Sequence, residues 1–169
     1  AMETAECWEI ALKRNDGPSV LALSRQGLPA LRKEAGAENL CARGGYILAE
    51  ADGNPRAVLM ASGSEVKIAL AARDALQADD IPARVVSLPC WEAFDTQPQD
   101  YRDEVLGKGT VRVAVEAAVP FGWERYVGLE GAVIGMTGFG ESAPASDLYE
   151  HFSITADAVA KAVKAQLRR

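Results

Sequence analysis

Residues 57–76 hold the feature that most constrains the fold of this chain, an apolar run that passes directly into a helical pattern. The run at residues 57–62 is almost entirely apolar, which is typical of a strand buried on both faces of a parallel sheet. Gly63 permits a sharp turn, and Ser64 belongs to the residue types that cap helices. Apolar residues then recur at helical spacing as far as Leu76. The sequence therefore predicts a strand, a turn and a helix in succession.

Further elements alternate around this unit and set the expected fold class. A strand at residues 83–88 would complete a β–α–β crossover with parallel strands. The alternation in residues 111–115 predicts a strand near an edge or half exposed, whereas residues 132–135 are typical of a buried strand. The remaining expected elements are a strand at 46–50, a short helical turn at 89–94 and helices at 99–106, 145–152 and 155–167. We therefore expect an α/β fold, with a mostly parallel open sheet and helices on both faces.

The N-terminal residues predict the end of another domain. A helix is expected at residues 3–14, and a buried type of strand at residues 19–24. A single helix and a single strand cannot bury their own apolar faces. Residues 1–29 are therefore interpreted as the last helix and strand of a preceding domain, most of which lies outside this sequence.

The next residues predict a linker and then a second domain. Residues 30–43 are rich in Ala, Glu and Lys or Arg and carry no sustained apolar stripe. The composition changes at Gly44-Gly45, after which strands and helices alternate to the end of the chain. We therefore expect residues 30–43 to be a linker and residues 44–169 to form one complete domain.

Charge and cysteine usage exclude several classes of function. The net charge of −6 argues against nucleic acid or an anionic membrane as a partner, because both require a basic surface. No apolar run approaches the roughly 20 residues of a transmembrane helix. Cys7, Cys41 and Cys90 are far apart and odd in number, and a single histidine is present. These features predict no disulfide framework and no metal site, and they favour the reducing cytoplasm.

Arg25 is the strongest candidate for a binding residue. It lies in a polar loop directly after the expected strand at residues 19–24. Ligands of open α/β sheets bind at the carboxyl ends of strands. The planar guanidinium group is permanently charged and can hold a phosphate through two parallel hydrogen bonds. The sequence therefore favours Arg25 as an anion ligand.

Other patterns have both a ligand interpretation and a structural one, and the sequence leaves these open. Ser64 begins a helix whose N-terminus could bind an anion, but Glu65 would oppose it. The glycine-rich loop at residues 138–144 fits a ligand loop or an ordinary connection. Glu116 has no partner nearby in sequence and is interpreted as structural. Five aromatic residues could form a pocket, a subunit contact or a core: Trp91, Phe94, Phe121, Trp123 and Tyr126.

Nine segments together resemble the transketolase family, and they follow the family's order along essentially the whole chain. They are residues 3–8, 23–29, 43–46, 61–66, 83–87, 93–95, 113–117, 127–129 and 135–145. The resemblance implies that residues 1–29 are the tail of a pyrimidine-binding domain and that residues 44–169 are the whole C-terminal α/β domain. It also implies that Arg25, in the Ser-Arg-Gln segment, helps to bind the sugar phosphate.

The resemblance implies the activity as well. Transketolases are homodimers that move a two-carbon ketol unit between sugar phosphates in the pentose phosphate pathway. They use thiamine diphosphate with a divalent metal, Mg or Ca. The family's cofactor ligands and catalytic residues would lie before Ala1, so we expect no catalytic, cofactor or metal ligand here and no activity of the isolated chain. Two alternatives remain, a regulatory module that binds a small anion and a purely structural dimerisation module.

Overall fold

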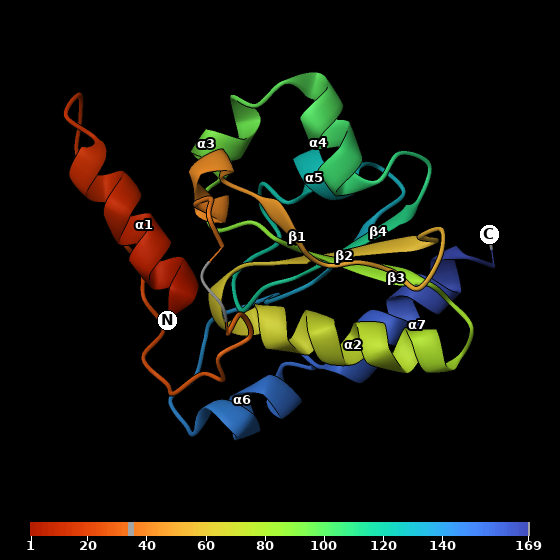
Figure 1. The fold of residues 1–169 in the computed structure, drawn as a ribbon. Coiled ribbons are helices and arrows are strands. Elements are labelled where there is room, and N and C mark those ends of the chain that lie inside the picture. Colours follow the sequence, from red (N-terminus) through yellow and green to blue (C-terminus); the bar gives the residue numbers. More distant parts are fainter. Residues whose placement is uncertain (34–35, 169) are drawn as a thin grey trace.

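The computed structural model describes residues 1–33 and 36–168, and its centre is a five-stranded sheet (Figure 1). Residues 34 and 35, inside the expected linker, and residue 169 lie outside the described part. The strands lie in the order β1-β3-β2-β4-β5. Only β1 runs antiparallel, to β3. The bounds are β1 Tyr46–Ala49, β2 Ala57–Ala61, β3 Ala83–Ser87, β4 Val111–Val115 and β5 Ala132–Ile134. The expected mostly parallel α/β fold is confirmed.

Helices cover both faces of this sheet. Figure 1 shows α2 and α7 below the sheet, with α3, α4 and α5 above it. The α-helices are α1 Met2–Lys13, α2 Val66–Ala78, α3 Trp91–Asp95, α4 Gln99–Leu106, α5 Glu124–Val127, α6 Ala145–His151 and α7 Ala156–Gln166, and the 3₁₀ helices are η1 Leu40–Arg43 and η2 Gly63–Glu65. No helix in the described ranges is long and apolar enough to cross a membrane.

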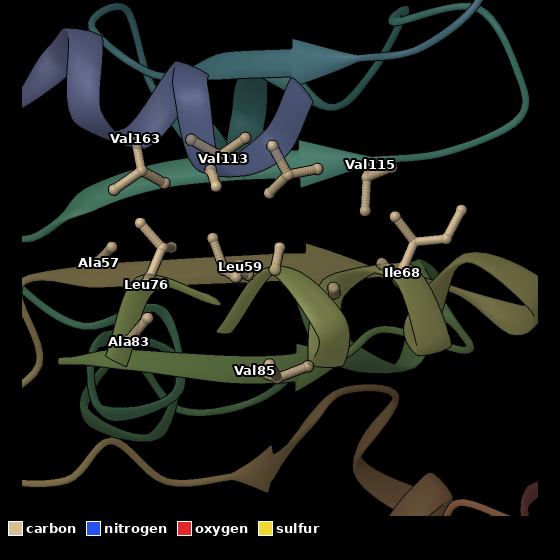
Figure 2. Packing of buried hydrophobic residues seen from close by; sticks show 14 of the residues in the cluster. Ala57, Leu59, Ile68, Leu76, Ala83, Val85, Val113, Val115 and Val163 are labelled. Atoms are coloured by element: carbon tan, nitrogen blue, oxygen red, sulfur yellow. The ribbon is translucent and has the colours of Figure 1, made fainter. Parts of the chain in front are cut away.

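Alternate residues of β2 supply the two halves of the core, because successive side chains of a strand point to opposite faces. Ala57 and Leu59 face α2 and α7, where Leu76 and Val163 belong to the same apolar cluster (Figure 2). Val58 and Met60 face the other half. The central strand is thus buried on both sides along its whole length, as its apolar run predicts.

The second half of the core is largely aromatic. Trp123 and Tyr126 are buried, and both meet Trp91 edge to face, at centroid distances of 4.9 and 5.2 Å. Phe94 meets Tyr126 in the same way, at 5.8 Å. Phe121 differs, with 86% of its side chain exposed. Four of the five aromatic candidates therefore belong to the packing of this face.

Several local predictions are wrong for reasons of tertiary context. Ser64 does not cap the helix, because η2 intervenes and α2 begins at Val66. The strand at residues 111–115 lies next to the edge of the sheet, as its pattern predicts, whereas residues 132–134, expected to be a buried strand, form the edge itself. Residues 19–24 form no strand, and Val20 is 92% exposed. A strand needs neighbours for its backbone groups, and no strand of the described residues pairs with this segment.

Polar contacts attach α1 to the domain. Arg32 forms a nearly buried ion pair with Glu6. The Tyr46 hydroxyl donates to Glu3 Oε1 at 2.7 Å, and the Ser87 hydroxyl donates to the same carboxylate. The segment between α1 and η1, which contains Arg25, is therefore fixed near both of its ends.

Candidate site at the carboxyl edge of the sheet

The connections of the sheet place a crevice between β2 and β4. The crossover from β2 to β3 uses α2 on one face, whereas the crossover from β4 to β5 uses α5 on the opposite face. β2 and β4 are neighbours, and both end at the same level, where Ala61 pairs with Val115. Ligands of open α/β sheets bind where neighbouring strands connect in opposite directions. A ligand site is therefore expected at this edge, at the switch point between β2 and β4.

The residue that follows each of these strands points into the crevice. Ser62 follows β2 and Glu116 follows β4, and the Ser62 hydroxyl donates to Glu116 Oε2 at 2.7 Å. Glu65, in η2, is only 3% exposed. Its Oε1 accepts hydrogen bonds from the hydroxyls of Ser64 and Tyr149. The chain thus places two acidic side chains together at the switch point.

Burial shifts the protonation of this pair. Burial, and after it the nearby Glu65 carboxyl, raise the pKa of the Glu116 carboxyl to about 8, and the Ser62 hydroxyl acts in the opposite direction. Glu116 therefore carries a proton at neutral pH. The acidic Glu65 side chain opposes an anion at the N-terminus of the η2–α2 segment, which weakens the anion-site interpretation of Ser64.

Glu116 should make the stability of the domain depend on pH. Its folded-state pKa lies above its ordinary value of 4.5, so its contribution to the free energy of unfolding is largest below that value and is lost as the pH rises through about 8. We expect the melting temperature of wild type to fall between about pH 5 and about pH 8, the interval between the two pKa values. The Glu116→Gln variant should lose most of this slope and be the more stable protein at the upper pH. The exposed Glu130→Gln is the matched control, and equal slopes in all three proteins would refute this assignment.

The structure brings Arg25 close to this edge through its two neighbours. Arg25 is exposed in a bend between Ser24 and Gln26. Gln26 Nε2 donates to the Tyr149 hydroxyl at 3.3 Å. The Ser24 hydroxyl lies 3.8 Å from the position that a Cβ on Gly63 would occupy. The loop therefore rests on the carboxyl edge while the guanidinium group of Arg25 stays open to solvent.

A wide cleft of about 1260 Å³ runs between the N-terminal segment and the domain. Residues 18–24 line one side, and Ser62, Gly63, Glu116 and Phe121 line the other. The cleft thus extends from the residues that precede Arg25 to the switch point between β2 and β4. The glycine-rich loop at residues 138–144 is more open. Phe139 is 98% exposed, and a Cβ on Gly138 or Gly140 would meet no described atom within 4 Å.

Sequence reasoning missed the partners of Glu116 and the role of Tyr149. Ser62 and Glu116 are 54 residues apart, so proximity in sequence gives no signal. Their shared position, directly after predicted parallel strands, was a usable signal. Tyr149 sits on a short helix with no motif around it, and only the fold places it beside Glu65. Within residues 1–33 and 36–168, no group of three or more His, Cys, Asp or Glu side chains could hold a metal ion.

Known proteins place this chain in a family. A family model described as "Transketolase-like TK C-terminal domain" matches residues 44–155. A transketolase from Sinorhizobium medicae is 57% identical over 99% of this chain and 24% of its own length. The solved transketolase from Leishmania mexicana is 41% identical, with a TM-score of 0.88 over 99% of this chain and 24% of that chain.

A third match, also to a solved structure, covers a larger share of the other protein's chain. The structure titled "Split gene transketolase, inactive beta4 tetramer" is 26% identical, with a TM-score of 0.67, over 85% of this chain and 48% of that chain. The chain itself spans about a quarter of the length of the curated relatives it matches. From its family match and its high identity to named relatives along nearly its whole length, the chain belongs to the transketolase-like C-terminal domain family.

Proposed function

We propose that this chain forms the C-terminal quarter of a transketolase, which transfers a two-carbon ketol unit between sugar phosphates. The observation that carries the proposal is the 57% identity to a named transketolase over 99% of the chain. In this proposal residues 1–29 are the tail of the pyrimidine-binding domain, residues 30–43 are a linker, and residues 44–169 are the C-terminal domain. The family match, which begins at residue 44, supports that boundary.

In this proposal Arg25 is the residue of this chain that contacts the substrate. Its neighbours hold the loop at the edge of the domain, and its side chain is exposed. A guanidinium group binds a phosphate by paired, charge-assisted hydrogen bonds. Arg25 therefore contributes binding of the sugar phosphate, and the domain behind it supports the loop.

The described residues do not fit thiamine diphosphate and its metal. The buried acidic side chain of Glu65 at the switch point opposes a diphosphate, and the described ranges offer no cluster of three metal ligands. The cofactor, with Mg or Ca, would bind to other parts of a homodimeric enzyme. We place that enzyme in the cytoplasm, in keeping with three separated cysteines, all free in the described residues.

The isolated 169-residue chain should therefore show no ketol transfer, because it lacks the cofactor-binding parts of the enzyme. The full-length enzyme containing it should convert sugar phosphates under the same conditions with thiamine diphosphate and Mg²⁺. The inactive split-gene relative supports the first expectation. The measurement is a coupled assay of both proteins at equal concentration. Activity of the pure chain, or none in the full-length enzyme, would contradict the proposal.

A further inference from the structure

We propose that Tyr149 is a positioning residue for Arg25, because its hydroxyl, held by Glu65, fixes the loop that carries Arg25 against the domain. The inference rests on the proposed role of Arg25 as a phosphate ligand. It gives the C-terminal domain a defined part in substrate binding, although the domain itself need not touch the substrate.

The hydrogen bonds around Tyr149 form a directed chain. The Tyr149 hydroxyl donates its proton to Glu65 Oε1, and the Tyr149 hydroxyl oxygen accepts a hydrogen bond from Gln26 Nε2 at 3.3 Å. A hydroxyl has one donor and two acceptor positions, so both contacts are made together. Burial and the Glu65 carboxyl raise the pKa of Tyr149 to about 12, and the hydroxyl keeps its proton at any assay pH. The bond to Glu65 therefore leaves a lone pair free for Gln26.

Glu65 fixes one end of this series of hydrogen bonds. It is nearly fully buried at the start of α2, and the Ser64 hydroxyl donates to the same carboxylate oxygen at 2.7 Å. The ammonium group of Lys67 lies 5.5 Å from the centroid of the Tyr149 ring and adds a cation–π contact. The ring also packs against the core cluster beneath α2 and α7. The hydroxyl of Tyr149 thus has a fixed place, at which Gln26 of the Arg25 loop donates its hydrogen bond.

Side-chain contacts must hold the Arg25 loop, since the described residues between α1 and η1 form no helix or strand. Gln26 bonds to Tyr149 on one side of Arg25, and Ser24 lies beside Gly63 on the other. Gly63 has a φ of +49°, a turn conformation that favours glycine, and this turn places residue 63 beside Ser24. The hydrogen bond of Gln26 thus ties the loop that carries Arg25 to the domain.

Loss of one of these contacts should lower the fraction of molecules in which Arg25 is placed for binding. The apparent affinity for a ligand falls in proportion to that fraction. Only substrates that use Arg25 would be affected. This selectivity separates a positioning role from a general loss of stability.

The test uses the full-length enzyme and the Tyr149→Phe variant, which removes the hydroxyl and keeps the ring. We expect KM for a phosphorylated acceptor to rise about 2- to 12-fold, the value of one neutral hydrogen bond, with kcat nearly unchanged. KM for the unphosphorylated analogue should not change. Gln26→Leu, which removes the other partner, should give the same pattern and serves if Tyr149→Phe folds poorly.

Tyr101→Phe is the matched control, because the Tyr101 hydroxyl donates to the carbonyl of Gly45 on the other face. It should show no selective change between the two acceptors. If Tyr149→Phe and Gln26→Leu behave like this control while Arg25→Ala loses its preference for the phosphorylated acceptor, the positioning role is overturned and the phosphate role of Arg25 stands.

The double variant Tyr149→Phe/Arg25→Ala separates the remaining outcomes. If Tyr149 acts through Arg25, adding Tyr149→Phe to Arg25→Ala should raise KM no further. An additional rise in the double variant would contradict the inference. If Arg25→Ala alone leaves the preference for phosphate unchanged, the proposed function of Arg25 fails, and the inference fails with it.

Discussion

Replacing Arg25 with alanine in the full-length enzyme is expected to lower kcat/KM for a phosphorylated acceptor by about 10- to 150-fold. This range is the roughly 1.5–3 kcal/mol of a charge-assisted hydrogen bond, converted to a rate ratio. Arg25 is exposed, and its neighbours rather than its own side chain hold the loop, so its loss should not unfold the domain. The unphosphorylated analogue of the same acceptor should react as with wild type. Steady-state kinetics with both acceptors measures the effect.

Two further variants define what the guanidinium group contributes. Arg25→Lys keeps the charge and loses the paired geometry, so it should fall between wild type and Arg25→Ala. Arg125→Ala is the control, because Arg125 is also exposed but pairs with Asp95 beside the aromatic half of the core. Equal rates of Arg25→Ala and wild type on the phosphorylated acceptor would show that Arg25 is an ordinary surface residue.

Replacing Gly44 with alanine is expected to destabilise the domain by roughly 3–5 kcal/mol, the sum of overpacking and left-handed backbone strain. Gly44 ends η1 with a φ of +77°. A Cβ there would lie 2.2 Å from both the carbonyl oxygen of Cys90 and the backbone nitrogen of Phe94. The carbonyl of Gly44 also accepts a hydrogen bond from Cys90 at 3.0 Å, so these backbones cannot separate freely. Chemical denaturation of the chain measures the loss.

Gly53→Ala is the matched control for this substitution. Gly53 also has a positive φ, of +96°, but a Cβ there would meet no described atom within 4 Å. It should therefore cost only the backbone strain, about 1–2 kcal/mol. A similar loss in both variants would show that close packing at Gly44 contributes little.

The elements themselves could be predicted where the pattern is local. The helix at Gln99–Leu106 and the strand at Val111–Val115 have the bounds that the sequence predicts. The central strand and the helix after it also follow from the apolar run and the helical spacing. Each of these signals lies within about a dozen residues, and the side-chain period of a helix or strand acts over that range.

Predictions failed where the outcome depends on distant residues. Ser64 has the residue type of a cap, yet its hydroxyl donates to Glu65, because η2 sets the start of the helix. Residues 19–24 have the composition of a buried strand, yet they form none, because a strand also needs partners. The relative positions of β4 and β5 depend on which strands pair, and apolar content alone does not encode that.

The sequence by itself determined the fold class, the central β–α–β unit and the candidacy of Arg25. These follow from side-chain period, turn chemistry and the charge of a guanidinium group, which are properties of short segments. Only the tertiary structure decided that Ser62 meets Glu116 and that Tyr149 joins Glu65 to Gln26. The physical reason is that in-register parallel strands bring their carboxyl ends to one edge, where residues 54 to 123 positions apart come within hydrogen-bonding distance.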